Sequence, residues 1–276
     1  MERKHEKYQR LIEACKALPP TPTAVAHPCD ETSLSGAVDA ARLGLIAPIL
    51  VGPKARIEAV AREHGIDIAG LPIVDVPHSH AAAEKAVELV REGKAEALMK
   101  GSLHTDELMG PVVQRETGLR TSRRISHCFV MDVPTYEHAL IVTDAAVNIA
   151  PTMEDKVHII QNAIDLAHAL RFPEVRVAIL SAMETINPKV PSTIEAAALC
   201  KMADRGQITG AILDGPLALD NAINLESVAI KKIDSPVAGR ANVLVVPDLE
   251  AGNMLAKSLS FLAGADAAGI VLGARV

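Results

Sequence analysis

Small polar and charged residues follow several apolar runs of this sequence, and their types suit the binding of an anion. Lys100, Gly101 and Ser102 stand between the run EALM and a stretch of helical character that begins near Thr105. A helix start presents free backbone N–H groups and the positive end of the helix dipole, and a lysine adds a full charge. The pattern therefore predicts an anion-binding turn. An ordinary glycine turn with a capping residue is the alternative, because no complete phosphate-loop or GxGxxG motif is present.

A second candidate for anion binding is the arginine-rich segment ETGLRTSRRISHC. It contains Arg115, Arg120, Arg123 and Arg124. A guanidinium group can bind phosphate or carboxylate through two parallel hydrogen bonds. A solvated basic loop would have the same composition. The segment coincides with a predicted domain boundary, and clefts between domains are frequent binding sites, which favours the anion-binding interpretation.

The stretch LDGPLALDNA places two aspartates after the apolar run ITGAIL. Asp214 and Asp220 could form a metal pair, an acid–base pair, or a turn followed by a helix cap. Asp214, Gly215 and Pro216 predict a turn at the end of a strand, which is where ligands of parallel α/β proteins bind. A helix cap is the better explanation of Asp220.

Two histidine motifs have spacings that do not support catalysis or metal binding. Ser126 and His127 are adjacent in an apolar run, and neighbouring residues of a strand point to opposite faces of a sheet. A Ser–His catalytic pair is therefore not expected. His78 and His80 could share a face, but no third ligand is evident, so a surface loop is expected. The four cysteines form no Cys-x-x-Cys pair, and buried free thiols are expected.

Apolar runs alternate with helical stretches through most of the chain. This order predicts an α/β fold of mainly parallel sheets with helices on both faces. The runs SHCFVMDVP and HALIVTDAA are separated by a connection too short for a crossover helix, so these two strands are expected to be antiparallel. Thr152, followed by Asp155 three residues later, predicts a capped helix start.

The composition indicates a large apolar core. The chain has 276 residues, 49% of them hydrophobic, with no Trp and a net charge of -6. No long basic run suggests a nucleic-acid partner. No apolar run is long enough to cross a bilayer, and the first residues are too charged for a signal peptide. A cytoplasmic protein with neither a nucleic-acid nor a membrane partner is expected.

Several motifs together resemble those of the phosphate acetyltransferase and phosphate butyryltransferase family. They include LMKGSLHTDEL, GLRTSRRISH, VTDAAVNIAPTMEDK, DGPLALDNA and SPVAGRANVLVVPDLEAGNML. The resemblance is dense from about Leu98 onward, and DGPLALDNA and VTDAAVNIAP are nearer to the butyryl-type branch. VAHPCDETSLSGAVDAARLGLIAPILVGP also resembles the transferase half of members that carry a hydratase-like domain in front.

The resemblance implies a reversible reaction in which acyl-CoA and phosphate give acyl phosphate and CoA, with an acyl group such as acetyl or butyryl. It implies two αβα domains with a cleft between them, as in isocitrate and isopropylmalate dehydrogenases, usually in a homodimer or higher homo-oligomer. Coenzyme A is then a substrate, and no metal or other cofactor forms the reaction centre.

The resemblance also suggests roles for the candidate residues. Arg120, Arg124 and Asp144 are expected to be catalytic, with the two arginines contacting phosphate or the anionic groups of CoA. The expected substrate-binding residues are Lys100, Gly101, Ser102, Asn148, Asp214, Gly215 and Pro216. The last three of these would shape the acyl end of the site.

The expected domains are residues 1–125 and residues 126–267, with about 268–276 completing the first. Family members continue beyond the equivalent of GARV into a Ser-Arg loop closely followed by aspartate, and this sequence stops at Val276. The residues of that loop therefore cannot be assigned here. Either the sequence is shortened, or the protein lacks a central part of the site. A non-catalytic CoA-binding or assembly module and an NAD-dependent hydroxy-acid dehydrogenase of related architecture are the alternative functions.

Overall fold

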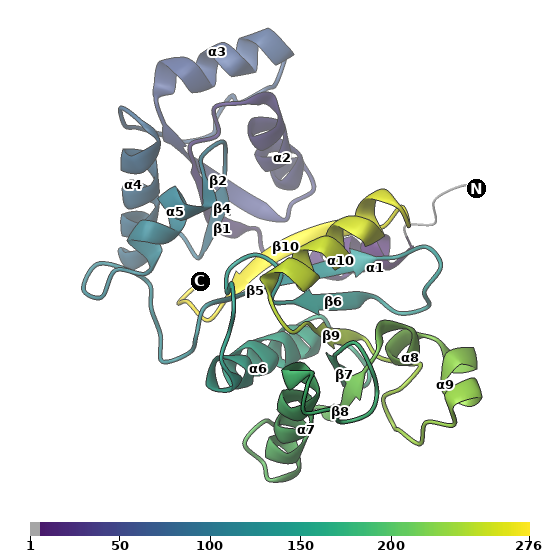
Figure 1. Ribbon diagram of the computed structural model, residues 1–276. Coiled ribbons are helices and arrows are strands. Elements are labelled where there is room, and N and C mark those ends of the chain that lie inside the picture. The colour runs from purple at the N-terminus through teal and green to yellow at the C-terminus, as the bar shows by residue number, and fades with distance from the viewer. Residues whose placement is uncertain (1–5) are drawn as a thin grey trace. The chain divides into compact units, whose positions relative to one another are not determined.

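The computed structural model describes residues 6–276, which divide into two compact units (Figure 1). The amino-terminal unit comprises Leu11–Ser122 and Ala274–Val276. The carboxy-terminal unit comprises Arg123–Gly273 together with residues 6–10. Helix α1 (Glu6–Cys15) contributes residues to both units. Among residues 6–276, no helix is both long and apolar enough to span a membrane.

The amino-terminal unit is built on a four-stranded parallel sheet in the order β3-β2-β1-β4. Its strands are β1 (Thr21–Ala26), β2 (Ile46–Gly52), β3 (Ile73–Asp75) and β4 (Ala97–Lys100). The connecting helices are α2 (Glu31–Arg42), α3 (Lys54–His64), α4 (Ser79–Arg91) and α5 (Thr105–Val112). Val25 and Leu50 of the sheet pack with Leu34 and Ile57 of two helices in a buried cluster. The alternation of apolar runs and helices predicted this parallel arrangement correctly.

The carboxy-terminal unit holds a six-stranded mixed sheet in the order β10-β5-β6-β9-β7-β8. Its strands are β5 (Ser126–Asp132), β6 (Leu140–Thr143), β7 (Arg176–Leu180), β8 (Ile212–Leu217), β9 (Val243–Val245) and β10 (Asp266–Leu272). Its helices are α6 (Met153–Ala169), α7 (Pro191–Asp204), α8 (Leu219–Ile223), α9 (Leu225–Lys231) and α10 (Leu249–Phe261). Strands β5 and β6 are antiparallel, as predicted.

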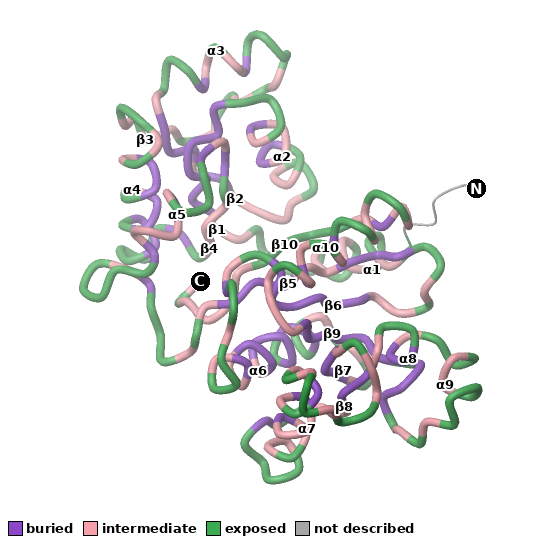
Figure 2. Tube along the Cα trace, viewed as in Figure 1, coloured by how far each residue is buried: buried purple, intermediate pink, exposed green. Residues whose placement is uncertain are grey.

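Alternate residues of β6 enter different apolar clusters because successive side chains of a strand point to opposite faces. Leu140 and Val142 belong to a cluster that includes residues of α8 and α10. Ile141 belongs to a second cluster with residues of α6 and α7. Both faces of this sheet are therefore covered, and the buried trace follows its central strands (Figure 2).

The division of the chain differs from the expected domains at both ends. The segment expected to complete the first domain, about 268–276, mostly belongs to β10, which pairs with β5 along its whole length. Only Ala274–Val276 belongs to the amino-terminal unit. At the other end, residues 6–10 join the carboxy-terminal unit because the backbone N–H groups of Lys7 and Tyr8 donate to Asp132 Oδ2, at 3.1 and 3.0 Å.

Candidate functional site

The loop that leaves β6 is organised by the side chain of Asp144, which is only 3% exposed. Its Oδ1 accepts hydrogen bonds from the N–H groups of Ala146 and Val147, both at 2.9 Å. Its Oδ2 accepts from the N–H groups of His127 at 3.2 Å and of Asn148 at 3.3 Å, and from Asn148 Nδ2 at 2.5 Å. Both carboxylate oxygens are thus committed to protein donors. Asp144 was expected to be catalytic, but its geometry is that of a residue that holds the loop in place.

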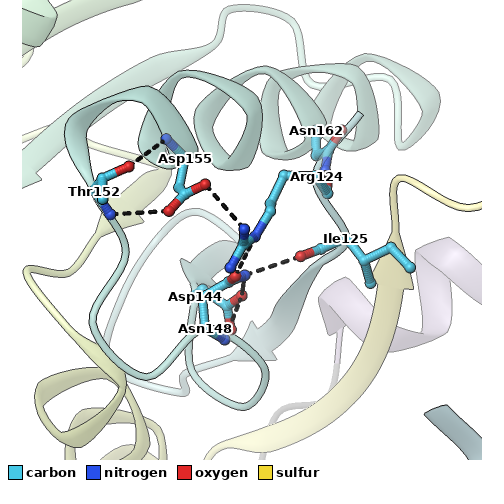
Figure 3. Close-up of polar contacts among 7 residues, drawn as sticks. All are labelled: Arg124, Ile125, Asp144, Asn148, Thr152, Asp155 and Asn162. Carbon is cyan, nitrogen blue, oxygen red and sulfur yellow. Dashed lines mark hydrogen bonds and ion pairs between the residues drawn. The ribbon is translucent and has the colours of Figure 1, made fainter. Parts of the chain in front are cut away.

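Asn148 is the link between this loop and the arginine-rich segment. It is 4% exposed, and its Nδ2 also donates to the carbonyl oxygen of Ile125 at 2.9 Å. Its Oδ1 accepts a hydrogen bond from Arg124 Nε at 2.8 Å. Hydrogen bonds fix both the NH₂ group and the oxygen of the Asn148 side-chain amide. The oxygen in turn fixes the Nε side of the Arg124 guanidinium (Figure 3).

A second acceptor for Arg124 comes from the start of α6. Arg124 Nη1 lies 3.2 Å from Asp155 Oδ1. The other oxygen, Asp155 Oδ2, accepts from the Thr152 N–H at 3.1 Å, and Thr152 Oγ1 accepts from the Asp155 N–H at 3.2 Å. The predicted capped helix start is confirmed. Burial of the Asp155 carboxyl opposes ionisation, but the Thr152 hydrogen bonds and the Arg124 charge outweigh it and lower its pKa.

Arg124 is left with a fixed orientation and an open side. Its side chain is 51% exposed. Among residues 6–276, no acceptor occupies its Nη2 nitrogen. A guanidinium that is held on Nε and Nη1 and open at Nη2 can receive an anionic oxygen without first searching for its conformation. This arrangement is suited to binding a phosphate group.

A buried amide on α6 also supports this segment. Asn162 of α6 donates through Nδ2 to the carbonyl oxygen of Arg124 and to Ser126 Oγ, both at 2.9 Å. Asn162 and Asp155 were not among the predicted site residues. The sequence showed Asp155 as part of a cap, but its second contact depends on how α6 packs beside β5.

In the predicted anion-binding turn at Lys100–Ser102, the backbone N–H groups of Gly101 and Ser102 are bonded to protein carbonyl oxygens. The N–H groups of Gly101 and Ser102 donate to the carbonyl oxygens of Ala26 and His27, at 2.8 and 2.9 Å. The Ser102 hydroxyl donates to the His27 carbonyl oxygen as well, at 2.9 Å. These donors are therefore not available to a ligand. A Cβ atom at position 101 would collide with the Ala26 carbonyl oxygen, so Gly101 permits the close approach of β1 and β4. What the turn can offer an anion is the Lys100 ammonium group.

The DGP stretch lies inside β8 and is not the strand-end turn that was predicted. Asp214 pairs with Ala178, and Leu217 pairs with Leu180 after an irregularity in the register. Asp214 Oδ1 accepts from the Gly215 N–H at 2.8 Å. A Cβ atom at Gly215 would lie 2.7 Å from the Ile179 carbonyl oxygen, so the two strands approach too closely there for a larger residue. The Gly215–Pro216 peptide bond is cis.

The two aspartates of that stretch lie in different elements, Asp214 in β8 and Asp220 in α8. Asp220 lies in the first turn of α8, where Ala218 is the N-cap, and its Oδ2 is 3.7 Å from Lys231 Nζ. Within residues 6–276, no three His, Cys, Asp or Glu side chains gather as metal ligands would. Asp220 was expected to be a cap, and it is instead a first-turn acidic residue.

The structure brings together three of the predicted residues, Arg124, Asp144 and Asn148. Arg120 belongs to the amino-terminal unit, as do Lys100, Gly101 and Ser102. Arg120 is exposed, and its backbone forms an antiparallel bridge with Ala274.

The cysteines are expected to be poor nucleophiles at neutral pH. Burial raises the pKa of Cys29 to about 11 and the pKa values of Cys128 and Cys200 to about 12. Since the thiolate is the reactive form, these thiols should react with an aromatic disulfide reagent at pH 8 about a hundredfold more slowly than half-buried Cys15. Titration of the folded protein checks this, with the denatured protein as the reference for all four thiols. Rapid stoichiometric modification of Cys200 would contradict it.

Comparisons with known proteins agree with the resemblance. The family model for phosphate acetyl/butaryl transferase matches residues 79–275. A phosphate acetyltransferase of Rhizobium meliloti is 67% identical over 98% of this chain and 85% of its own length. A phosphate butyryltransferase of Clostridium acetobutylicum is 38% identical over 97% of this chain and 89% of its own length. The crystal structure of a branched-chain phosphotransacylase from Enterococcus faecalis V583 superposes with a TM-score of 0.80 at 31% identity, covering 92% of this chain and 90% of that one.

These relatives also allow a comparison with the acetyl-type and butyryl-type branches of the family. DGPLALDNA was expected to mark the butyryl-type branch, but of these two named enzymes the acetyltransferase is the more similar. The chain therefore has relatives in both branches of the family. The match of the family model over most of the chain and the identity to these relatives establish that the chain belongs to the phosphate acetyl/butyryl transferase family.

Proposed function

We propose that this protein catalyses the reversible transfer of a short acyl group between coenzyme A and inorganic phosphate. Membership of the phosphate acetyl/butyryl transferase family over almost the whole chain is the observation that carries this conclusion. The oriented and half-exposed guanidinium of Arg124 supports it, since a phosphate substrate needs a fixed cation.

The chemistry requires two anionic reactants to meet. A phosphate oxygen attacks the thioester carbonyl carbon, an oxyanion forms, and the C–S bond breaks to release the CoA thiolate. Acyl phosphate and CoA are the products, and the reaction involves no oxidation or reduction. Cations that hold phosphate reduce its repulsion from the oxyanion and fix the attacking oxygen in line with the carbonyl.

Roles for the individual residues are part of this proposal. Arg124 is proposed to bind phosphate, with Asn148 and Asp144 keeping its segment in place. Arg120 and Lys100, which are exposed cations of the amino-terminal unit, are proposed to contact the anionic groups of CoA. The neighbourhood of Asp214, Gly215 and Pro216 is proposed to shape the acyl end of the site.

The finer properties are part of the same proposal. The acyl group is short, such as acetyl or butyryl. The two units form αβα domains of the dehydrogenase-like kind. The protein acts in the cytoplasm as a homodimer or higher homo-oligomer. CoA is a substrate, and the reaction centre uses no metal or prosthetic group.

Phosphate dependence of thiol release tests the proposed function. Release of free CoA from acetyl-CoA and from butyryl-CoA is measured with a thiol reagent, with and without inorganic phosphate. We expect release to require phosphate and to saturate with its concentration, because phosphate is the acyl acceptor. Thiol release at the same rate without phosphate would show hydrolysis and would overturn the proposal.

A further inference from the structure

Asp155 carries two separate interactions on its two carboxylate oxygens. Oδ2 accepts from the Thr152 N–H and so belongs to the helix cap, while Oδ1 faces Arg124 Nη1 at 3.2 Å. The carboxylate is 22% exposed and cannot rotate freely, because the cap fixes one of its oxygens. An acceptor fixed in this way can orient a flexible arginine at little further cost in entropy.

Asp155 and Asn148 hold Arg124 from two different elements. Asn148 lies in the loop after β6 and fixes Nε, and Asp155 lies in the first turn of α6 and fixes Nη1 (Figure 3). The guanidinium is planar, so two contacts at different nitrogens define the direction of the third. An arginine side chain otherwise loses about 2 kcal/mol of rotamer freedom when a ligand orders it.

Two opposing effects of Asp155 on phosphate binding need to be weighed. Its negative charge repels a phosphate bound at Nη2. That repulsion acts across partly exposed groups and is screened by solvent and salt. Its fixed contact removes most of the ordering cost of Arg124 and aims Nη2 outward. Because the cap fixes the geometry and the charges are only partly buried, we expect orientation to outweigh repulsion.

We propose that Asp155 is a positioning residue of the phosphate site, which aims the open nitrogen of Arg124 at the acyl-accepting phosphate. This inference rests on the proposed function for the identity of the anion. It adds a residue that is not itself in contact with substrate and that acts on phosphate binding through the orientation of Arg124. The backbone N–H of Thr152 supports it by fixing Asp155 Oδ2.

Asp155→Asn separates the two tasks of the carboxylate. The Asn oxygen can still accept from the Thr152 N–H, but the group that then faces Arg124 is an NH₂, which cannot accept a hydrogen bond. We expect the KM for phosphate to rise about tenfold with kcat within about threefold of wild type. The Kd for inorganic phosphate from calorimetric titration should rise by the same factor, and the KM for acyl-CoA should not change.

Three further variants make the result interpretable. Asp155→Glu retains the charge and the acidic third residue of a capping box, and its Kd for phosphate should lie within about threefold of wild type. Thr152→Ala loses the cap hydroxyl but keeps the Asp155–Arg124 pair, so its Tm should fall while its Kd for phosphate stays unchanged. Asp67→Asn makes the same charge change at an exposed carboxylate that accepts from the Ala69 N–H at 2.9 Å, and it should behave as wild type.

The outcomes distinguish the inference from the function on which it rests. If Asp155→Asn binds phosphate as tightly as wild type, or more tightly, the positioning role is wrong. If Thr152→Ala weakens phosphate binding as much as Asp155→Asn does, the effect comes from the cap and not from orientation of Arg124, and the inference is again wrong. Thiol release by the wild type that ignores phosphate would instead contradict the proposed function.

Discussion

Replacement of Arg124 by glutamine is expected to lower kcat/KM for phosphate by about a hundredfold, the effect found when one fixed donor to a developing anion is removed. Glutamine keeps a polar side chain of similar length but has neither the charge nor the two-nitrogen fork. The Arg124 side chain is half-exposed, and its ion pair with Asp155 is partly solvated, so Tm should change little. Steady-state kinetics with varied phosphate at saturating acyl-CoA measures the effect.

The matched control for this variant is Arg42→Gln. Arg42 is an exposed arginine on α2 with one ion pair, to Asp39 at 3.4 Å, so the change in net charge is the same. Its kinetics should equal those of the wild type. If Arg124→Gln also retained the phosphate KM and the kcat of the wild type, Arg124 would not be the phosphate-binding residue.

Replacement of Asp144 by alanine is expected to have the largest effect on stability. The carboxylate is buried and accepts five hydrogen bonds. Without it, several buried N–H groups are left unpaired, and each costs about 1–3 kcal/mol when no water replaces the acceptor. Because the loop can relax in part, we expect a loss of about 3 kcal/mol and a fall in Tm of about 10 °C.

The Asp144→Ala variant should lose activity as well as stability. The loss of activity should be larger than the loss of folded protein alone would cause. Asn148 loses the acceptor of its backbone N–H and one of the two acceptors of its side-chain NH₂ group, and Asn148 fixes Arg124 Nε. Calorimetric unfolding is the measurement, with Asp75→Ala as the control. Asp75 is an exposed carboxylate that accepts from the Lys54 N–H at 2.9 Å, and the loss of this contact should cost about 1 kcal/mol at most. A Tm of the Asp144 variant within 2 °C of wild type would contradict the expectation.

The elements of the fold that could be predicted are those set by local patterns. The alternation of apolar runs and helices predicted the parallel sheet of the amino-terminal unit and the parallel part of the second sheet. The short connection before Leu140 predicted the antiparallel pair β5–β6. Thr152 and Asp155 gave the start of α6. The pairing of β10 with β5 could not be predicted, because it joins residues far apart in the chain and depends on which sheet edge is free. The position of Asp214–Pro216 inside β8 could not be predicted either, because it follows from the pairing of β8 with β7.

The candidate site was predictable to a similar degree. Asp144 and Asn148 follow β6, and Arg124 precedes β5, so the pairing of these two strands brings them together. The hydrogen bonds from the Gly101 and Ser102 N–H groups to backbone carbonyl oxygens were not predictable, because they depend on where the neighbouring strand β1 ends. The sequence showed the types of groups near the site, and the tertiary structure decides which of them remain free for a ligand.

The most direct test of the central claim is the identity of the product. The protein is incubated with acetyl-CoA and inorganic phosphate, and acetyl phosphate is followed by phosphorus NMR while free CoA is followed by thiol titration. We expect acetyl phosphate and CoA to appear in equal amounts, and acetyl-CoA and phosphate to re-form when the two products are supplied. Release of CoA with free acetate and no acetyl phosphate would contradict acyl transfer to phosphate.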